Sequence, residues 1–130
     1  MIKKIFITIL LSVTLISNSY SAGSSSSGGE GDGPKTKTNY EKAVKFIKSA
    51  KKFEKKGKKD KAQSSYEKAL KLLLKSNTKK PNKPDTLNYL GFTSRKLGDF
   101  ENGEKYYLQG LAINPYHIGI NEYLGELYVA

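Results

Sequence analysis

Apolar side chains recur at helical intervals along most of the chain after residue 37. The stripe of the first predicted helix consists of Val44, Phe46, Ile47, Ala50 and Phe53. Thr38 and Glu41 precede this stripe with the spacing of a capping box, in which the threonine hydroxyl accepts an early backbone N–H and the glutamate reaches back. Gly57 is placed to end the helix. The pattern therefore predicts an amphipathic helix that begins near Thr38 and ends before Gly57.

A second apolar stripe follows after this glycine. Its members are Ala62, Tyr66, Ala69, Leu70 and Leu73. The segment from Asn77 to Pro84 is rich in lysine and contains two prolines, so it is predicted to be a loop that the helix does not enter. The second helix is therefore expected to end near Ser76.

From Pro84 onward the helical pattern returns. One helix is predicted over about residues 85–97 and another over about residues 99–113, with a turn at Gly98 between them. A further amphipathic segment begins at Ile118 and continues to the last residue of the sequence. The sequence thus predicts a series of helices joined by short turns.

The pattern repeats along the chain. Leu124 and Gly125 stand 34 residues after Leu90 and Gly91. The residues around Gly91 match almost position for position the template of the tetratricopeptide repeat, a helical hairpin of about 34 residues. The chain from residue 43 onward therefore resembles the tetratricopeptide repeat family. The positions that carry the resemblance are Ala50, Gly57, Ala62, Tyr66, Ala69, Leu87, Leu90, Gly91, Gly98, Tyr107, Gly110, Pro115, Leu124 and Gly125.

The resemblance implies an all-α fold, a solenoid of helical hairpins with about two and a half repeats. The first repeat covers about residues 43–76, the second about 84–117, and a partial third 118–130. Small residues in the repeat let paired helices approach closely. Gly103 and Gly110 stand where the family has alanine, and each lowers the helix propensity of the second repeat by roughly 1 kcal/mol. The second repeat is therefore expected to depend on its neighbours.

The partial third repeat has a first helix without a partner helix. Gly125 holds the place of the small residue that packs against a following helix, which favours a fragment of a longer array over a short cap. Tyr123, Leu124, Leu127 and Tyr128 leave much apolar surface for a cap. We therefore expect marginal stability, or self-association through the open C-terminal repeat.

The start of the sequence predicts export. A short basic stretch precedes an apolar run that is too short to span a bilayer, and small residues follow, as in a signal peptide over residues 1–21 that is cleaved after Ser21. Residues 22–37 form a Gly/Ser-rich segment that we expect to be a disordered linker before the domain at residues 38–130. The expected protein is exported, of bacterial type, and periplasmic or secreted. An uncleaved N-terminal membrane anchor is the alternative.

The net charge of +11 is unevenly distributed. Residues 35–83 hold 18 lysines against four carboxylates, whereas residues 84–130 hold three basic residues against six carboxylates. This asymmetry indicates an electrostatic partner for the first half, such as an anionic membrane surface or another polyanion. The lysine excess is explained equally simply by the codon usage of an AT-rich genome. Only Arg95 is an arginine, and arginine supplies the bidentate fork that recognises phosphates and bases, so nucleic acid is not favoured as a partner.

Residues for catalysis or metal binding are scarce. The sequence has no cysteine and a single histidine, His117, which lies in a predicted turn without a second metal ligand or a nucleophile beside it. Carboxylates at helical spacing, such as Glu101 and Glu104, fit solvated helix faces better than acid–base chemistry. We therefore expect no enzymatic activity and no cofactor.

In tetratricopeptide arrays the first helices of successive repeats line a concave groove that binds peptides. Carried over position by position, the resemblance assigns this groove to Ile47, Lys51, Lys55, Asn88, Phe92, Arg95, Lys96, Glu122 and Glu126. Phe92 is the candidate anchor for a ligand, and the alternative is that it packs against the third repeat. The predicted function is an exported scaffold that binds a protein or peptide partner. The other prediction is a lysine-rich electrostatic binder of an anionic surface or polyanion.

Overall fold

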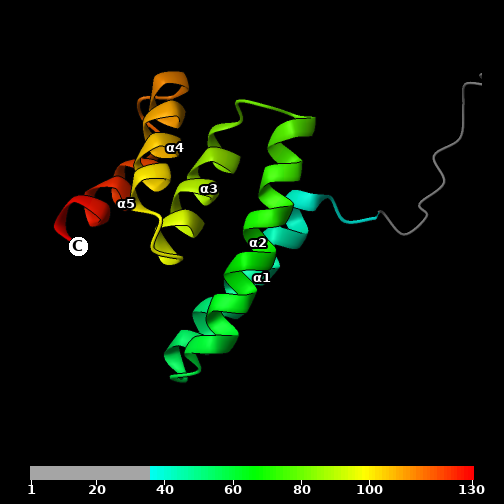
Figure 1. The fold of residues 1–130 in the computed structure, drawn as a ribbon. Helices are drawn as coiled ribbons and strands as arrows, with labels where there is room; N and C mark the ends of the chain where they lie inside the picture. The colour runs from blue at the N-terminus through cyan, green and yellow to red at the C-terminus, as the bar shows by residue number, and fades with distance from the viewer. Residues whose placement is uncertain (1–35) are drawn as a thin grey trace, which may run out of the picture. The chain divides into compact units, whose positions relative to one another are not determined.

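The structure is a computed structural model that describes residues 36–130. The predicted signal peptide, its cleavage position and most of the predicted linker lie outside the described residues. The described residues form five α-helices (Figure 1), which are α1 (Asn39–Lys55), α2 (Lys59–Lys79), α3 (Pro84–Lys96), α4 (Phe100–Ile113) and α5 (Ile118–Val129).

The helices pack as antiparallel hairpins in chain order. α1 packs along α2 and α3 along α4, while α2 contacts α3 and α4 contacts α5. Because α3 also contacts α1 and α5, these three first helices form one layer and α2 and α4 form the other. The predicted all-α arrangement of repeated hairpins is therefore confirmed.

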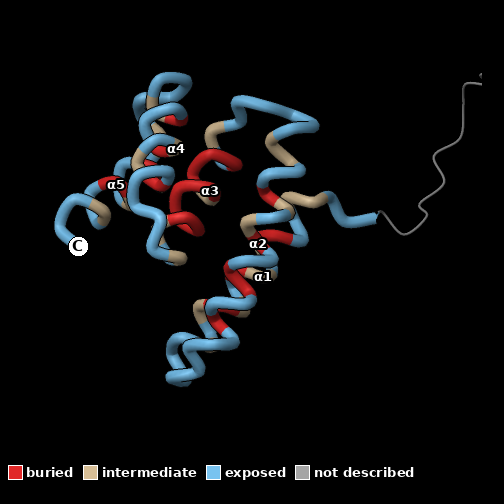
Figure 2. Tube along the Cα trace, in the orientation of Figure 1, coloured by how far each residue is buried: buried red, intermediate tan, exposed pale blue. Residues whose placement is uncertain are grey.

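The buried residues lie on the helices, most densely along α3 (Figure 2). The hydrophobic core consists of Ala43, Ile47, Ala50, Ala62, Tyr66, Ala69, Leu73, Leu87, Leu90, Phe92, Tyr107, Ile120 and Leu124. Most of the predicted repeat-signature residues belong to this core or, like Gly91 and Gly110, are buried beside it. The exposed members of the signature are Gly57, Gly98, Pro115 and Gly125.

Helix ends are fixed by the residues that the sequence indicated. Thr38 caps α1 in a capping box, in which the Glu41 backbone N–H donates to the Thr38 hydroxyl at 3.2 Å and the Thr38 N–H donates to the Glu41 carboxylate at 2.8 Å. Gly57 and Gly98 follow α1 and α3 with φ angles of 68° and 85°, a left-handed conformation that glycine adopts without steric cost. Asp99 caps α4 with its side chain.

The prediction that the second helix ends near Ser76 was wrong. α2 continues to Lys79, and the Thr78 hydroxyl supports the extra turn by donating to the Leu74 carbonyl at 3.0 Å. Pro81 then limits the helix, because a residue before proline avoids the helical conformation. Part of the predicted loop therefore belongs to α2 and lengthens the first hairpin.

None of the five helices between residues 36 and 130 combines the length and apolar character needed to cross a bilayer.

Candidate functional site

The surface formed by α1, α3 and α5, called here the first-helix face, contains the predicted groove residues. Ile47 and Phe92 are each 2% exposed and Asn88 is 8% exposed, so these three side chains do not reach the surface. Lys51 and Arg95 are half-buried. The members that are exposed are Lys55, Lys96, Glu122 and Glu126.

Phe92 packs inside the molecule between two aromatic rings. Its ring centroid lies 6.0 Å from that of Tyr66 on α2, in an edge-on arrangement, and 4.9 Å from that of Tyr123 on α5. The prediction that Phe92 is a surface anchor is therefore wrong, and the alternative, packing against the third repeat, is correct. The physical reason is that α5 brings Tyr123 over the ring, which no residue near Phe92 in the sequence reveals.

Three cations surround this aromatic cluster. The ammonium of Lys51 lies 4.5 Å from the Phe92 ring centroid, and the charged groups of Arg95 and Lys96 lie 5.7 and 5.8 Å from it. Lys51 Nζ also donates a hydrogen bond to the Tyr123 hydroxyl at 3.3 Å. Such contacts stabilise a cation over a ring by about 0.5–2 kcal/mol, depending on how far water is excluded.

Two of these three cations pair with carboxylates from a neighbouring repeat. Lys96 Nζ lies 3.0 Å from Glu54 Oε1, and Arg95 Nη2 lies 2.5 Å from Glu126 Oε2. Exposed pairs of this kind contribute about 0–1 kcal/mol each. They hold α1 to α3 and α3 to α5, so they link successive repeats. Lys51 has no carboxylate within ion-pair distance among residues 36–130.

The Glu54 carboxylate also accepts a hydrogen bond from Tyr66. The Tyr66 hydroxyl donates to it at 3.0 Å. Burial of the ring, together with this bond and the negative charge of Glu54, raises the pKa of the Tyr66 hydroxyl, which stays protonated at neutral pH. A cleft of about 410 Å³ lies beside Glu54, Tyr66 and Lys96, between the first hairpin and the end of α3.

A larger cleft of about 710 Å³, called here the end cleft, lies at the opposite end of the first hairpin. It is lined by the residues before and at the start of α1, the end of α2 with the following loop, the start of α3, and the turn between α4 and α5. Its basic residues are Lys37, Lys79, Lys80 and Lys83. The sequence showed that these lysines exist, but their meeting in one cleft depends on the antiparallel pairing of α1 with α2.

His117 lies in the wall of the end cleft and caps α5. Its Nδ1 accepts the Ile120 backbone N–H at 3.1 Å, and its Nε2 lies 2.8 Å from Asp85. A ring with an acceptor at Nδ1 carries its proton on Nε2, so Nε2 donates to the Asp85 carboxylate. Both nitrogens are thus used in structural hydrogen bonds. Within residues 36–130 no three histidine, aspartate or glutamate side chains gather as metal ligands.

The last helix leaves part of its surface uncovered. Leu124 is buried, but a Cβ added at Gly125 would meet no atom within 4 Å, and Tyr128 and Val129 are exposed. Tyr128 is held on one side, because its hydroxyl donates to Glu104 of α4 at 2.6 Å. Self-association through this surface stays a prediction.

Comparison with known families gives a match in two segments. Residues 53–72 and 85–117 match the family model described as the tetratricopeptide repeat. These segments cover the end of α1, most of α2, and the hairpin of α3 and α4 with the turn that follows. A search of the curated proteins found no match.

Proposed function

Because the chain belongs to the tetratricopeptide repeat family, we propose that it is an exported, non-enzymatic scaffold that binds a protein segment on the first-helix face. Tetratricopeptide repeats mediate protein–protein interaction and scaffolding, and proteins built from them are typically not enzymes.

The unpaired charge of Lys51 carries this proposal. Glu54 and Glu126 balance Lys96 and Arg95, whereas Lys51 has only a neutral hydroxyl and aromatic rings as partners among the described residues. Its stem is half-buried, so the ammonium is held in one place instead of moving freely in solvent. A fixed cation at the centre of the face favours a partner segment that brings a carboxylate there.

The remaining exposed charges around Lys51 suggest how such a segment is oriented. α1 presents Lys55 and α5 presents Glu122, and neither forms an ion pair within residues 36–130. The face is therefore basic toward the first repeat and acidic toward the last. A segment with acidic residues at one end and basic residues at the other would lie across the face in one direction only.

The test compares two variants that remove the same charge. Proteins retained by the immobilised chain are identified by mass spectrometry, and each purified candidate is titrated against the wild type, Lys51→Met and the control Lys105→Met. Methionine keeps the aliphatic packing of the lysine stem. We expect Lys51→Met to weaken binding at least about fivefold, the value of one charge-assisted contact. Lys105 is exposed on α4, outside the face, and its replacement should leave the affinity unchanged.

Two results would contradict the proposal. Equal affinity for the wild type and Lys51→Met would remove Lys51 from the binding surface. Retention of no protein at all would argue against the scaffold function itself.

Export is supported by the signal-peptide pattern of residues 1–21. Expression of the whole sequence with a C-terminal tag in a bacterial host tests it directly. We expect the purified protein to begin at Ala22, as determined by intact mass. A mass that includes Met1 would favour the uncleaved membrane anchor or a protein that is not exported.

A further inference from the structure

The end cleft gathers four lysines against a single carboxylate. Lys37, Lys79, Lys80 and Lys83 are all exposed, and none forms an ion pair within residues 36–130. The only carboxylate in the lining belongs to Asp85, which accepts a hydrogen bond from His117. The cleft is therefore a site of concentrated positive charge.

Crowding of like charges extends beyond the lining. Lys37 lies close to Lys45 of α1, and its proximity and positive charge lower the pKa of Lys45. Ammonium groups repel each other, so their approach indicates a shortage of acidic partners at this end of α1.

An exposed apolar turn lies beside this charge. Asn114 and His117 line the cleft, and the turn between them carries Tyr116, which is 89% exposed. Ile118, which follows, is 82% exposed. These are among the most exposed large apolar side chains of the described residues. Tyr116 lies in a tight turn, in which its backbone N–H donates to the Asn114 side chain at 3.2 Å, and Ile118 is the first residue of α5, so both positions are held by the fold.

Basic residues and a protruding aromatic and aliphatic pair at one end of a molecule match the chemistry of an anionic membrane surface. Lysines near such a surface contribute about 1 kcal/mol each through attraction to the headgroups. Tyrosine is favoured at the interface between headgroups and acyl chains, and an adjacent isoleucine inserts into the apolar side of it. An acidic protein segment would use the lysines but would leave Tyr116 and Ile118 without a role.

We propose that this end of the domain, composed of the end cleft and the turn with Tyr116 and Ile118, docks onto anionic phospholipid. The lysines attract the headgroups and the two apolar side chains enter the interface. This inference is independent of the proposed scaffold function, because the first-helix face with Lys51 lies outside the cleft lining.

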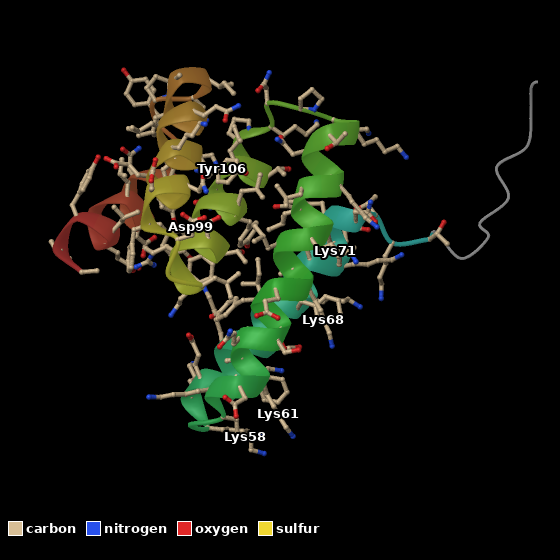
Figure 3. The ribbon with its side chains drawn as sticks, viewed as in Figure 1. Lys58, Lys61, Lys68, Lys71, Asp99 and Tyr106 are labelled. Carbon is tan, nitrogen blue, oxygen red and sulfur yellow. The ribbon has the colours of Figure 1, made fainter. Side chains whose placement is uncertain are left out.

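The length of the first hairpin supplies a matched control. From Lys58 to Lys79 the chain rises about 31 Å along α2. Electrostatic attraction falls off within about 8–10 Å at physiological ionic strength. Lysines at the far end, including Lys58 and Lys61 (Figure 3), would therefore contribute little to docking through the end cleft. If instead the long axis of the first hairpin lay parallel to the membrane, lysines along its whole length would contribute equally to binding.

The experiment follows a fluorescent probe placed in the turn. The sequence has no cysteine, so Tyr116→Cys can be labelled at one position with an environment-sensitive dye. The labelled full chain is titrated with vesicles of phosphatidylcholine alone and with vesicles that contain about 30 mol% phosphatidylglycerol. We expect a blue shift of the emission with the anionic vesicles only. The same dye at Tyr128→Cys, on the far end of α5, should not shift.

Two triple variants then test the role of the lysines in the same labelled chain. Lys79→Gln, Lys80→Gln and Lys83→Gln together should weaken the vesicle-dependent shift about tenfold or more, because three attractions to the headgroups are lost. Lys58→Gln, Lys59→Gln and Lys61→Gln together should weaken it less than about twofold. All variants carry the same N-terminal residues, so a contribution of that segment to vesicle binding is constant.

Three outcomes would overturn the inference. Equal losses in the two triple variants would show diffuse attraction of the whole hairpin. An unshifted probe at position 116 would show that the turn does not enter the interface. Binding of a polyglutamate peptide that depends on Lys79, Lys80 and Lys83, without any shift on anionic vesicles, would assign the cleft to an acidic protein.

Discussion

Single residues decide how closely the two helices of the second repeat approach. A Cβ added at Gly91 would lie 2.4 Å from the ring of Tyr107, which is fully buried. A Cβ at Gly103 would lie 3.2 Å from the Gly91 carbonyl oxygen. The sequence identified Gly103 only as a cost in helix propensity. The structure gives it a reason, since α3 and α4 cross with backbone against backbone at this point.

Replacement of Gly91 by alanine should therefore destabilise the protein despite the better helix propensity of alanine. Overpacking against a rigid buried ring costs about 1–3 kcal/mol, and alanine regains about 1 kcal/mol in the helix, so a net loss of up to about 2 kcal/mol is expected. Chemical denaturation followed by circular dichroism measures the change.

Gly125 provides the matched control, because it has the same position in the third repeat and no atom within 4 Å of its added Cβ. Gly125→Ala should leave the stability unchanged or raise it by up to about 1 kcal/mol. Equal destabilisation by Gly91→Ala and Gly125→Ala would show that the contact with Tyr107 does not limit the helix approach.

Phe92 shows the limit of position-by-position inference. The repeat template correctly placed it on a first helix, but it could not show that Tyr123 of the next repeat covers the ring. Contacts between repeats depend on the angle between successive hairpins, which the spacing within one repeat does not contain.

Phe92→Ala should accordingly act on folding before it acts on binding. Loss of a buried phenylalanine costs about 3–5 kcal/mol, and the change also removes the contacts with Tyr66 and Lys51. Thermal unfolding of the variant should show a large decrease in midpoint. Tyr116→Ala removes an aromatic that is exposed and should change the stability by no more than about 0.5 kcal/mol. An unfolding midpoint of Phe92→Ala equal to that of the wild type would show that the Phe92 ring does not contribute to the core, and Phe92 would again be a candidate for ligand binding.

At the scale of the elements, helix boundaries were predicted well where a capping residue or a glycine marks them, and less well elsewhere. The capping box at Thr38 and the glycine turns could be predicted because each depends on residues close together in the sequence. The end of α2 was not predicted, since lysine favours a helix while asparagine and threonine weakly disfavour it, and the outcome depends on the packing of the added turn beside the start of α1. Only Pro81 marked a firm limit.

The start of α4 gives a prediction for acid titration. Asp99 accepts hydrogen bonds from the Asn102 side chain at 2.7 Å and from the Asn102 backbone at 3.2 Å, and these bonds hold the pKa of Asp99 below its ordinary value of 3.8. Because the folded pKa is lowered, the stabilisation is present above the unfolded pKa and is lost as the pH falls through the folded value.

Asn102→Ala removes the side-chain bond and leaves the backbone bond. The pKa of Asp99 should therefore rise toward its ordinary value, as followed by NMR of the carboxyl carbon. The stability difference between variant and wild type should shrink as the solution is acidified below the ordinary pKa. Gln109→Ala on the same helix should leave the Asp99 titration as it is. An unchanged pKa in Asn102→Ala would assign the shift to the backbone bond alone.

At the scale of the whole molecule, charge is distributed by hairpin. The described part of the first hairpin and its following loop, residues 36–83, holds 17 lysines against four carboxylates, whereas residues 84–130 carry an excess of acid. The sequence predicted this asymmetry fully, because it depends on composition alone. What it could not predict is that Lys96 pairs across repeats, or that four lysines meet in one cleft, since both follow from helix packing.

The repulsion among these lysines should make the fold more stable in salt. Glu54 is the one carboxylate of the first hairpin that forms an ion pair within residues 36–130, so screening removes more repulsion than attraction. We expect the thermal unfolding midpoint to rise as sodium chloride is increased from low to physiological concentration and above. The variant with Lys58→Gln, Lys59→Gln and Lys61→Gln should start from a higher midpoint in low salt and gain less from added salt, because part of the repulsion is already gone. A midpoint that falls with salt would contradict this expectation. It would mean that the attraction within the pairs Glu54–Lys96 and Arg95–Glu126 outweighs the repulsion among the lysines.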